Sequence, residues 1–114
     1  MTAVPQKVLE LVVFKLAAGV TSDHFLATVD RVSSWIGRQP GFISRELSYD
    51  AEGDRWIEVV WWSTPQDAQS ATELAMTSDS CAPMFGLIDM NSALMLHGEL
   101  AIARVASSCV VASA

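Results

Sequence analysis

Six segments with two different hydrophobic periodicities follow one another along the chain, and their order limits the fold more than any other feature. Helix-like segments separate the first strand-like run from the second, and the third from the fourth. With right-handed crossovers, this order predicts an antiparallel sheet in the spatial order 4-1-3-2, with both helices on one face. The sequence therefore predicts an α+β fold of the ferredoxin-like βαββαβ type. The strand-like runs are Lys7–Lys15, Phe42–Tyr49, Arg55–Ser63 and Ala93–Arg104.

Capping residues mark where the two helices begin. Thr21 is a candidate N-cap, and the apolar residues after it recur at helical spacing, which predicts one continuous helix. Thr64 followed by Pro65 predicts the start of the second helix. A short helical piece is expected from Pro83, and residues 89–92 are expected to form a turn before the last strand. The apolar positions of the first helix are Phe25, Val29, Val32 and Ile36.

Length and charge narrow the class of protein. The 114 residues contain no linker, so residues 1–114 are expected to form a single domain, with its core at about 7–104 and a tail at 105–114. The net charge of −6 disfavours a nucleic-acid partner, because an acidic surface repels phosphates. No apolar run reaches the length of a membrane span and no export signal is visible, so we expect a cytoplasmic protein without a membrane partner. Cys81 and Cys109 form no motif and are expected to be free thiols.

Alternation along the strands divides their residues between the two faces of the sheet. One set is nearly all apolar, with Arg45 as the exception, and is expected to lie under the helices. The other set mixes large apolar residues with carboxylates. The first set is Leu9, Leu11, Val13, Ile43, Leu47, Tyr49, Ile57, Val59, Trp61, Leu94, Leu96 and Leu100. The second is Val8, Glu10, Val12, Phe14, Phe42, Ser44, Glu46, Ser48, Trp56, Glu58, Val60, Trp62, Met95, His97 and Glu99.

The second set predicts both an interface and a cavity. Its apolar residues would form too large a patch for a soluble monomer, so a second copy of the sheet is expected to cover them in a homodimer. Its carboxylates cannot all be buried dry and ionised. A partly wet cavity lined by aromatic rings and a few acids, which binds a small molecule, satisfies both constraints.

Several motifs resemble the antibiotic-biosynthesis-monooxygenase-like group of the dimeric α/β-barrel superfamily, over roughly Val8 to Leu100. The resemblance implies a dimeric α/β barrel. Its cofactor-free members oxidise phenolic polycyclic substrates with molecular oxygen, and their tryptophan at the end of the third strand matches Trp62. The motifs are Gln39-Pro40-Gly41-Phe42-Ile43-Ser44-Arg45-Glu46-Leu47, Arg55-Trp56-Ile57-Glu58-Val59-Val60-Trp61-Trp62, Ser63-Thr64-Pro65-Gln66-Asp67-Ala68, Met84-Phe85-Gly86-Leu87-Ile88-Asp89 and Ser92…His97.

The sequence departs from the pattern of these enzymes at one position and lacks a ligand at another. Glu58 stands where the resemblance leads us to expect an amide. Heme-degrading relatives use a histidine on the second helix, and Gln66–Ser78 contains none. We therefore expect no heme, no other cofactor and no metal site.

The candidate site residues follow from the strand order. His97, Glu10 and Glu58 are expected on three adjacent strands, with His97 as general base and Glu58 orienting its imidazole. Trp62 and Trp56 are expected to stack on a flat ligand, and the remaining substrate-binding candidates are Glu10, Phe14 and Glu46. Two functions stay open: a cofactor-independent monooxygenase or isomerase of an aromatic or polyketide-like molecule, and a non-catalytic ligand-binding or sensing module. In the alternative interpretation of these residues, they only pack an interface.

Overall fold

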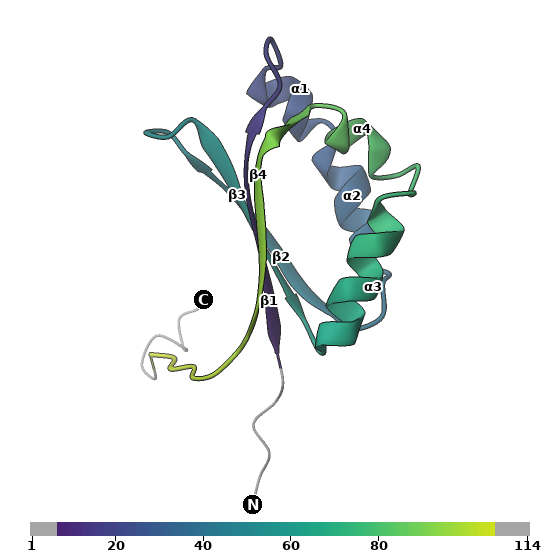
Figure 1. Cartoon of the computed structure of the whole chain (residues 1–114), viewed down its shortest axis with the longest axis vertical. Helices are drawn as coiled ribbons and strands as arrows, with labels where there is room; N and C mark the ends of the chain where they lie inside the picture. The colour runs from purple at the N-terminus through teal and green to yellow at the C-terminus, as the bar shows by residue number, and fades with distance from the viewer. Residues whose placement is uncertain (1–6, 107–114) are drawn as a thin grey trace, which may run out of the picture.

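The structure is a computed structural model that describes residues 7–106. Its elements are β1 (Val8–Leu16), α1 (Ser22–Leu26), α2 (Val29–Ile36), β2 (Phe42–Asp50), β3 (Arg55–Trp62), α3 (Pro65–Ala75), α4 (Ala82–Phe85) and β4 (Ile88–Glu99). The strands form one antiparallel sheet in the order β2-β3-β1-β4, with the helices on one side (Figure 1). The predicted ferredoxin-like α+β fold and strand order are confirmed. Cys109 and all but the first residues of the predicted tail lie outside the described residues.

The helix predicted after Thr21 is two helices. α1 ends at Leu26 and α2 begins at Val29, because Thr28 interrupts the regular ladder. Both the hydroxyl and the backbone N–H of Thr28 donate to the carbonyl oxygen of Phe25, at 2.7 and 2.9 Å. This three-residue spacing tightens the turn. The predicted apolar side is kept, since Phe25 and Val32 are both buried.

The last strand is displaced from its predicted bounds. β4 begins at Ile88 rather than Ala93 and ends at Glu99 rather than Arg104. The turn expected over residues 89–92 is a bulge within the strand, because Val13 of β1 pairs with Leu94 whereas Lys15 pairs with Asp89. Ser92 closes the bulge: its Oγ accepts from the Lys15 N–H and donates to the Asp89 carbonyl. The sequence predicts a turn at these residues but does not indicate that the strand continues through it.

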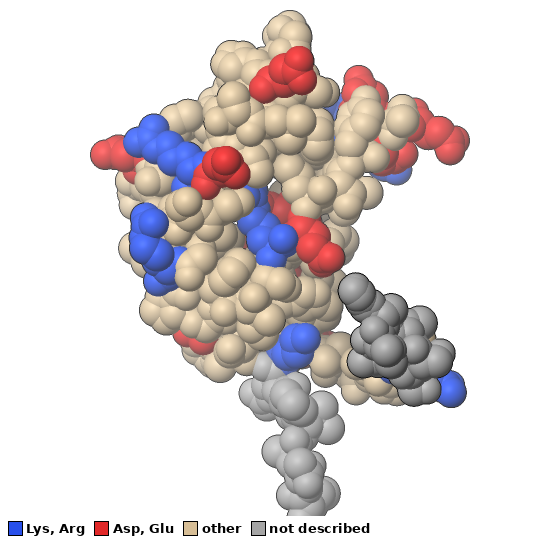
Figure 2. All heavy atoms as spheres, turned by 180° about the vertical axis from the view of Figure 1, so that it is seen from behind, with Lys and Arg blue, Asp and Glu red and all other residues tan. Residues whose placement is uncertain are grey.

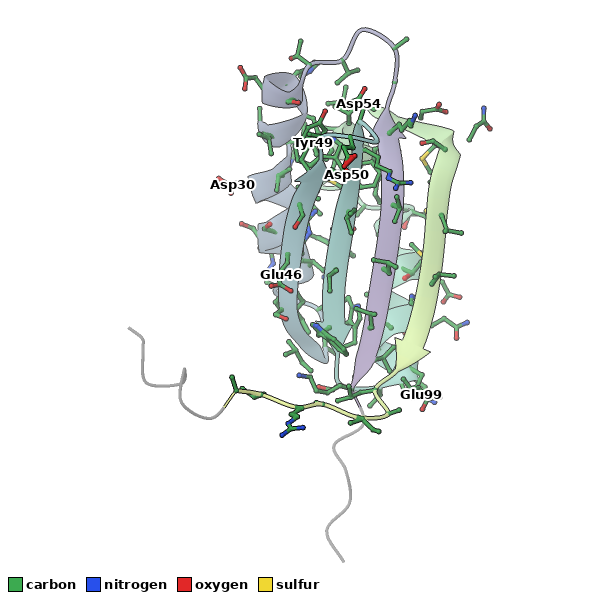
Figure 3. The ribbon with its side chains drawn as sticks, turned by 90° about the vertical axis from the view of Figure 1, so that its left-hand side faces the viewer. Asp30, Glu46, Tyr49, Asp50, Asp54 and Glu99 are labelled. Atoms are coloured by element: carbon green, nitrogen blue, oxygen red, sulfur yellow. The ribbon has the colours of Figure 1, made fainter. Side chains whose placement is uncertain are left out.

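The prediction of which face lies under the helices was wrong for β1, β3 and β4. The buried residues of β1 and β3 belong to the mixed set: Val8, Glu10, Phe14, Trp56, Glu58, Val60 and Trp62. Both sets are apolar enough to be buried, and alternation alone does not say on which side the helices pack. The open face, seen in Figure 3, therefore carries the apolar set instead: Leu9, Leu11, Val13, Ile57, Val59, Trp61, Leu94 and Leu96.

A bulge in β2 changes the face of its later residues. Phe42 pairs with Trp62 and Ser44 already pairs with Trp61, so one extra residue stands in β2 between them. Arg45 and Leu47 then lie on the helix-covered face. Glu46 lies on the open face, opposite Val59 (Figure 3).

Two clusters of buried side chains join the sheet to the helices. One centres on Trp62, Val60 and Ile36. The other contains Phe14, Phe25, Trp56, Val32, Cys81 and Met84. Charged groups stay outside these clusters for the most part, and Figure 2 shows basic and acidic side chains scattered over the surface. Within residues 7–106, no helix combines the length and hydropathy that a membrane span requires.

We expect Phe25→Ala to destabilise the fold strongly. Phe25 is 0% exposed and packs against Phe14 and Trp56, with ring centroids 5.6 and 4.9 Å away. Removing such a ring costs about 3–5 kcal/mol of unfolding free energy, measurable by urea unfolding. Leu26→Ala is the matched control, because its side chain is 47% exposed and its loss should cost much less. Equal losses in the two variants would contradict the packing described here.

Candidate functional site

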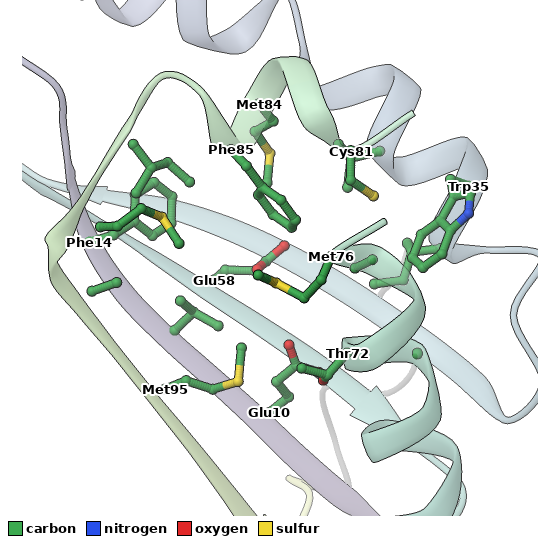
Figure 4. Close-up of a pocket in the computed structure, with 18 of the residues that line it drawn as sticks. Glu10, Phe14, Trp35, Glu58, Thr72, Met76, Cys81, Met84, Phe85 and Met95 are labelled. Atoms are coloured by element: carbon green, nitrogen blue, oxygen red, sulfur yellow. The ribbon is translucent and has the colours of Figure 1, made fainter. Parts of the chain in front are cut away.

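A cavity of about 240 Å³ lies between the sheet and the helices (Figure 4). β1, β3 and β4 form its floor, and α2, α3 and α4 form its walls and roof. The lining is mostly apolar, with aromatic rings and sulfur-bearing side chains prominent: Phe14, Trp35, Trp62, Phe85, Met76, Met84, Met90, Met95 and Cys81. Among residues 7–106, the carboxylate and hydroxyl side chains that line it are Glu10, Glu58 and Thr72. Such a site suits an apolar ligand that a few polar groups orient.

Glu10 reaches the cavity from near the start of β1. Its neighbour in the pairing with β3 is Val60, so Trp62 lies diagonally beside it on the same face. The indole Nε1–H of Trp62 donates to Glu10 Oε1 at 3.0 Å. Because Trp62 is fully buried, this bond gives its N–H the partner that a buried indole needs.

Glu58 reaches the cavity from β3 and is paired with Arg45. The Arg45 Nε–H donates to Glu58 Oε2 at 2.5 Å, and the two side chains are 6% and 11% exposed. Arg45 also donates from Nη1 to the hydroxyl of Ser33 at 2.8 Å and to the Val29 carbonyl at 3.4 Å. The arginine therefore ties β2 and β3 to α2 as well as compensating the carboxylate.

The surroundings of Glu10 raise the pKa of its carboxyl group above the usual value of 4.5. Burial is the largest cause, because it disfavours the charged form. The negative charge of Glu58 acts in the same direction. The Trp62 hydrogen bond and the nearby His97 act against the shift without cancelling it.

His97 lies at the edge of the site rather than in the cavity. It pairs with Glu10 across β1 and β4, and its Nε2 is 3.8 Å from Glu10 Oε1, which is too long for a hydrogen bond. Its side chain is 36% exposed and lines a separate hollow with Pro65 and Gln69. Glu58, which we expected to orient the imidazole, is paired with Arg45 instead.

The structure brings together four of the seven predicted site residues. Glu10, Phe14, Glu58 and Trp62 all line the cavity. Trp56 is buried away from it, between Phe25 and Tyr49, both at 4.9 Å. Glu46 is exposed on the open face, because the β2 bulge turns it away.

Sequence reasoning missed Arg45 as a site residue. The sequence prediction places Arg45 on the helix-covered face. It assumes regular alternation along β2, however, and regular alternation puts Arg45 and Glu58 on opposite faces of the sheet; the β2 bulge brings them to the same face. The methionines and Trp35 were also missed, and we find no sequence signal that separates a cavity methionine from a core one.

Burial raises the pKa of the Cys81 thiol, which makes it a poor nucleophile. Within residues 7–106, no three His, Cys, Asp or Glu residues gather as a metal-ligand set.

The comparisons with known proteins agree on the fold. No family model matches the sequence, and no curated protein matches it either. Among solved structures, the chain is similar to SnoaB, a cofactor-independent oxygenase from Streptomyces nogalater, with 16% identity and a TM-score of 0.61 over 90% of this chain and 98% of that one. It is also similar to a candidate antibiotic biosynthesis monooxygenase from Bordetella bronchiseptica, with 17% identity and a TM-score of 0.67 over 85% and 99% of the two chains.

A third similar structure is a dimeric ferredoxin-like protein of unknown function from Thermobifida fusca. Its identity is 11% and its TM-score is 0.67, over 83% of this chain and 92% of that one. At these identities the likeness is one of fold. The resemblance to antibiotic-biosynthesis-monooxygenase-like proteins that the sequence suggested is thereby confirmed at the level of structure.

The raised pKa of Glu10 predicts how stability depends on pH. The folded protein holds the Glu10 proton more strongly than the unfolded chain, so this stabilisation is fully present below pH 4.5 and is lost as the pH rises through the raised pKa. We expect the unfolding free energy, relative to Glu10→Gln, to fall over that range and then level off. Urea unfolding at a series of pH values measures it. Thr72→Val, a neutral change in the same cavity, is the control and should show no such slope; a flat difference for Glu10→Gln would contradict the shift.

Proposed function

We propose that this protein binds a flat, largely apolar aromatic molecule in the cavity and oxygenates it with molecular oxygen, without a cofactor. One observation carries the proposal: two carboxylates, Glu10 and Glu58, reach into a cavity whose other walls are almost wholly apolar and aromatic. Such a cavity excludes water around a ring while offering groups that can accept or donate a proton.

The shape and lining of the cavity support an aromatic ligand. Trp35 and Phe85 stand on the helix side, and Trp62 stands on the sheet side. Aromatic pairs contribute about 0.5–1.5 kcal/mol beyond the area they bury, enough to orient a ring. The methionine side chains are flexible and can fit rings of different outline.

The proposed reaction needs only proton transfer and oxygen. A phenolic substrate that has lost a proton is electron-rich enough to react with oxygen directly. At an activated methylene carbon, two hydrogen atoms leave, one oxygen atom is added as a carbonyl, and the second oxygen atom leaves as water. A carboxylate within hydrogen-bond reach of the hydroxyl can take the first proton. We propose that Glu58 takes this proton, and that His97, on the outer side of Glu10, exchanges the proton of the Glu10 carboxyl with solvent.

SnoaB, which shares the fold, is described as a cofactor-independent oxygenase, and this supports the same class of reaction here. The alternative is a module that binds the molecule without changing it. The pairing of Glu58 with Arg45 favours this alternative, because the guanidinium already engages one oxygen of the carboxylate.

An anthrone separates the two functions. We expect the native protein to consume oxygen with the anthrone under air, and to form the quinone and water. General base catalysis contributes about 10²–10⁴-fold to a rate. Glu58→Gln should therefore lower oxygen uptake at saturating anthrone by about a hundredfold, and His97→Ala by less.

The anaerobic sample is the control for this measurement, and the anthrone alone under air gives the background rate. If the native protein binds the anthrone and returns it unchanged under air, the oxygenase function fails and the binding function stands.

We further propose that the protein is a homodimer in which the open faces of two sheets meet. This face is the corrected position of the predicted interface. Its central residues Leu11, Val59 and Trp61 are apolar, and no element of the described chain covers them (Figure 3). Soluble monomers rarely leave so large an apolar patch in water. The dimeric state described for the Thermobifida fusca protein supports a second copy as the cover.

A charge at the centre of this face should separate the subunits. We expect light scattering to give twice the chain mass of 12.3 kDa for the native protein and the single chain mass for Val59→Lys, because burying an unpaired ammonium costs several kcal/mol. Ser48→Lys, on the edge strand of the same face, is the matched control and should stay dimeric. A native protein that is monomeric at micromolar concentration would contradict the proposal.

A further inference from the structure

The two cavity carboxylates share one feature: each has one oxygen held by the protein and one oxygen free. Oε1 of Glu10 is held by Trp62, and Oε2 of Glu58 is held by Arg45. Neither remaining oxygen has a hydrogen-bond partner among the described residues. Neither is fully buried, since residues 7–106 contain no fully buried side-chain oxygen without a partner, and both glutamates line the cavity.

We propose that these two free oxygens recognise complementary groups on one ligand, with Glu10 as a neutral acid that donates to a carbonyl and Glu58 as a carboxylate that accepts from a hydroxyl. The ligand class is then a flat aromatic ketone that also carries a phenolic hydroxyl. This inference rests on the proposed function, because it assumes an aromatic molecule in the same cavity, and it specifies which aromatic molecules fit.

The contacts around Glu10 favour its neutral form. Among the described residues no lysine or arginine pairs with Glu10: its basic neighbour is His97, whose Nε2 lies 3.8 Å from Oε1, beyond hydrogen-bond distance, and Arg45 is paired with Glu58. The Trp62 N–H binds Oε1, which can serve as the carbonyl oxygen of a protonated acid. The acid proton is then on Oε2, the oxygen that is free to donate into the cavity. Burial and the charge of Glu58 raise the pKa of Glu10 in the direction this requires.

The contacts around Glu58 favour its ionised form. A buried guanidinium needs a negative partner, and Glu58 is the only carboxylate that pairs with Arg45 among the described residues. The other partners of Arg45, the Ser33 hydroxyl and the Val29 carbonyl, are neutral. Glu58 therefore keeps its charge, and its free Oε1 can only accept.

The two acids stand close enough to bind one molecule. Glu10 pairs with Val60, two residues from Glu58 along β3, so the two glutamates are diagonal neighbours on one face. Such neighbours are about 7–8 Å apart. Figure 4 shows both side chains pointing from the sheet into the cavity, below Phe85 and Met76. A rigid aromatic ring system can span this separation with a hydroxyl at one end and a carbonyl at the other.

The arrangement also suits the proposed reaction. When the hydroxyl of the ligand loses its proton, negative charge spreads onto the conjugated carbonyl oxygen. A neutral acid that donates a hydrogen bond to that oxygen stabilises the charge, whereas a second carboxylate would repel it. Opposite protonation states in one cavity are a general way to divide acid and base roles between two carboxyl groups.

Four related probes test the recognition in the native protein. Fluorene carries neither group, 9-fluorenone carries the carbonyl, 2-hydroxyfluorene carries the hydroxyl, and 2-hydroxy-9-fluorenone carries both. Dissociation constants come from quenching of tryptophan fluorescence at neutral pH. We expect each group to strengthen binding about tenfold, since one satisfied hydrogen bond in a buried site is of that size. We call the increase in affinity that the carbonyl group gives the carbonyl gain, and the increase that the hydroxyl gives the hydroxyl gain. The carbonyl gain should disappear as the pH rises and Glu10 loses its proton. The other titratable groups beside Glu10 are Glu58 and His97.

Variants of Glu10 decide its protonation state. Glu10→Gln keeps a donor and should keep the carbonyl gain at every pH, whereas Glu10→Leu should lose it. Glu58→Gln should lose the hydroxyl gain. If that variant fails to fold because Arg45 is left unpaired, the double variant Arg45→Met/Glu58→Gln removes both charges and should lose the same gain.

Infrared spectroscopy gives a second readout that needs no ligand. The native protein at neutral pH should show the C=O stretch of a neutral carboxylic acid, and Glu10→Gln should lack it. Absence of that band, or equal loss of the carbonyl gain in Glu10→Gln and Glu10→Leu, overturns the neutral-acid assignment. If all four probes bind equally, the recognition fails while aromatic binding survives; if none binds, the proposed function itself fails.

Discussion

Two glutamates stand on the face of the sheet that the helices cover, and the surrounding structure depends on giving each an internal partner. Trp62 binds Glu10 and Arg45 binds Glu58. Without them, the helices would seal carboxylates in an apolar space at a cost larger than the net stability of a small domain. Trp62 lies on β3 and Arg45 on β2. Strand pairing and the β2 bulge therefore bring these partners to the glutamates and allow the helices to cover this face of the sheet. The helix-covered face can therefore hold both a core and a polar site.

The cavity exists because the roof is built from long, adaptable side chains rather than from a continuous helix. α3 ends at Ala75 and the four-residue α4 follows after a break, so that Met76, Met84 and Phe85 close the space from above. Arg45 links this roof to the floor, since its Nη2 lies 3.7 Å from the sulfur of Met84. Similar folds place the chain in a structural group, but a fold hosts many reactions, and the two carboxylates are what make this site particular.

The sheet is apolar on both faces, which explains why one face could be taken for the other. The helices cover Val8, Val60 and Trp62, and the opposite side of the same strands presents Leu9, Val59 and Trp61. An antiparallel sheet with one solvated face shows polar residues there. Strands that are apolar on both sides indicate that both faces of the sheet are covered. The helices cover one face and, as we propose, a second sheet covers the other.

The sequence by itself determined the order and type of the elements, and hence the ferredoxin-like topology, because periodicity, capping residues and crossover handedness are local or nearly local properties. It also singled out Glu10, Glu58, Phe14 and Trp62, which share a face through simple alternation. Only the tertiary structure decided which face the helices cover, that Glu46 turns away from the cavity while Arg45 shares the face of Glu58, and that His97 lies beside Glu10 rather than Glu58. Those outcomes depend on one extra residue in β2 and on which buried charges find partners. Both are settled by packing across strands and helices, which no single segment encodes.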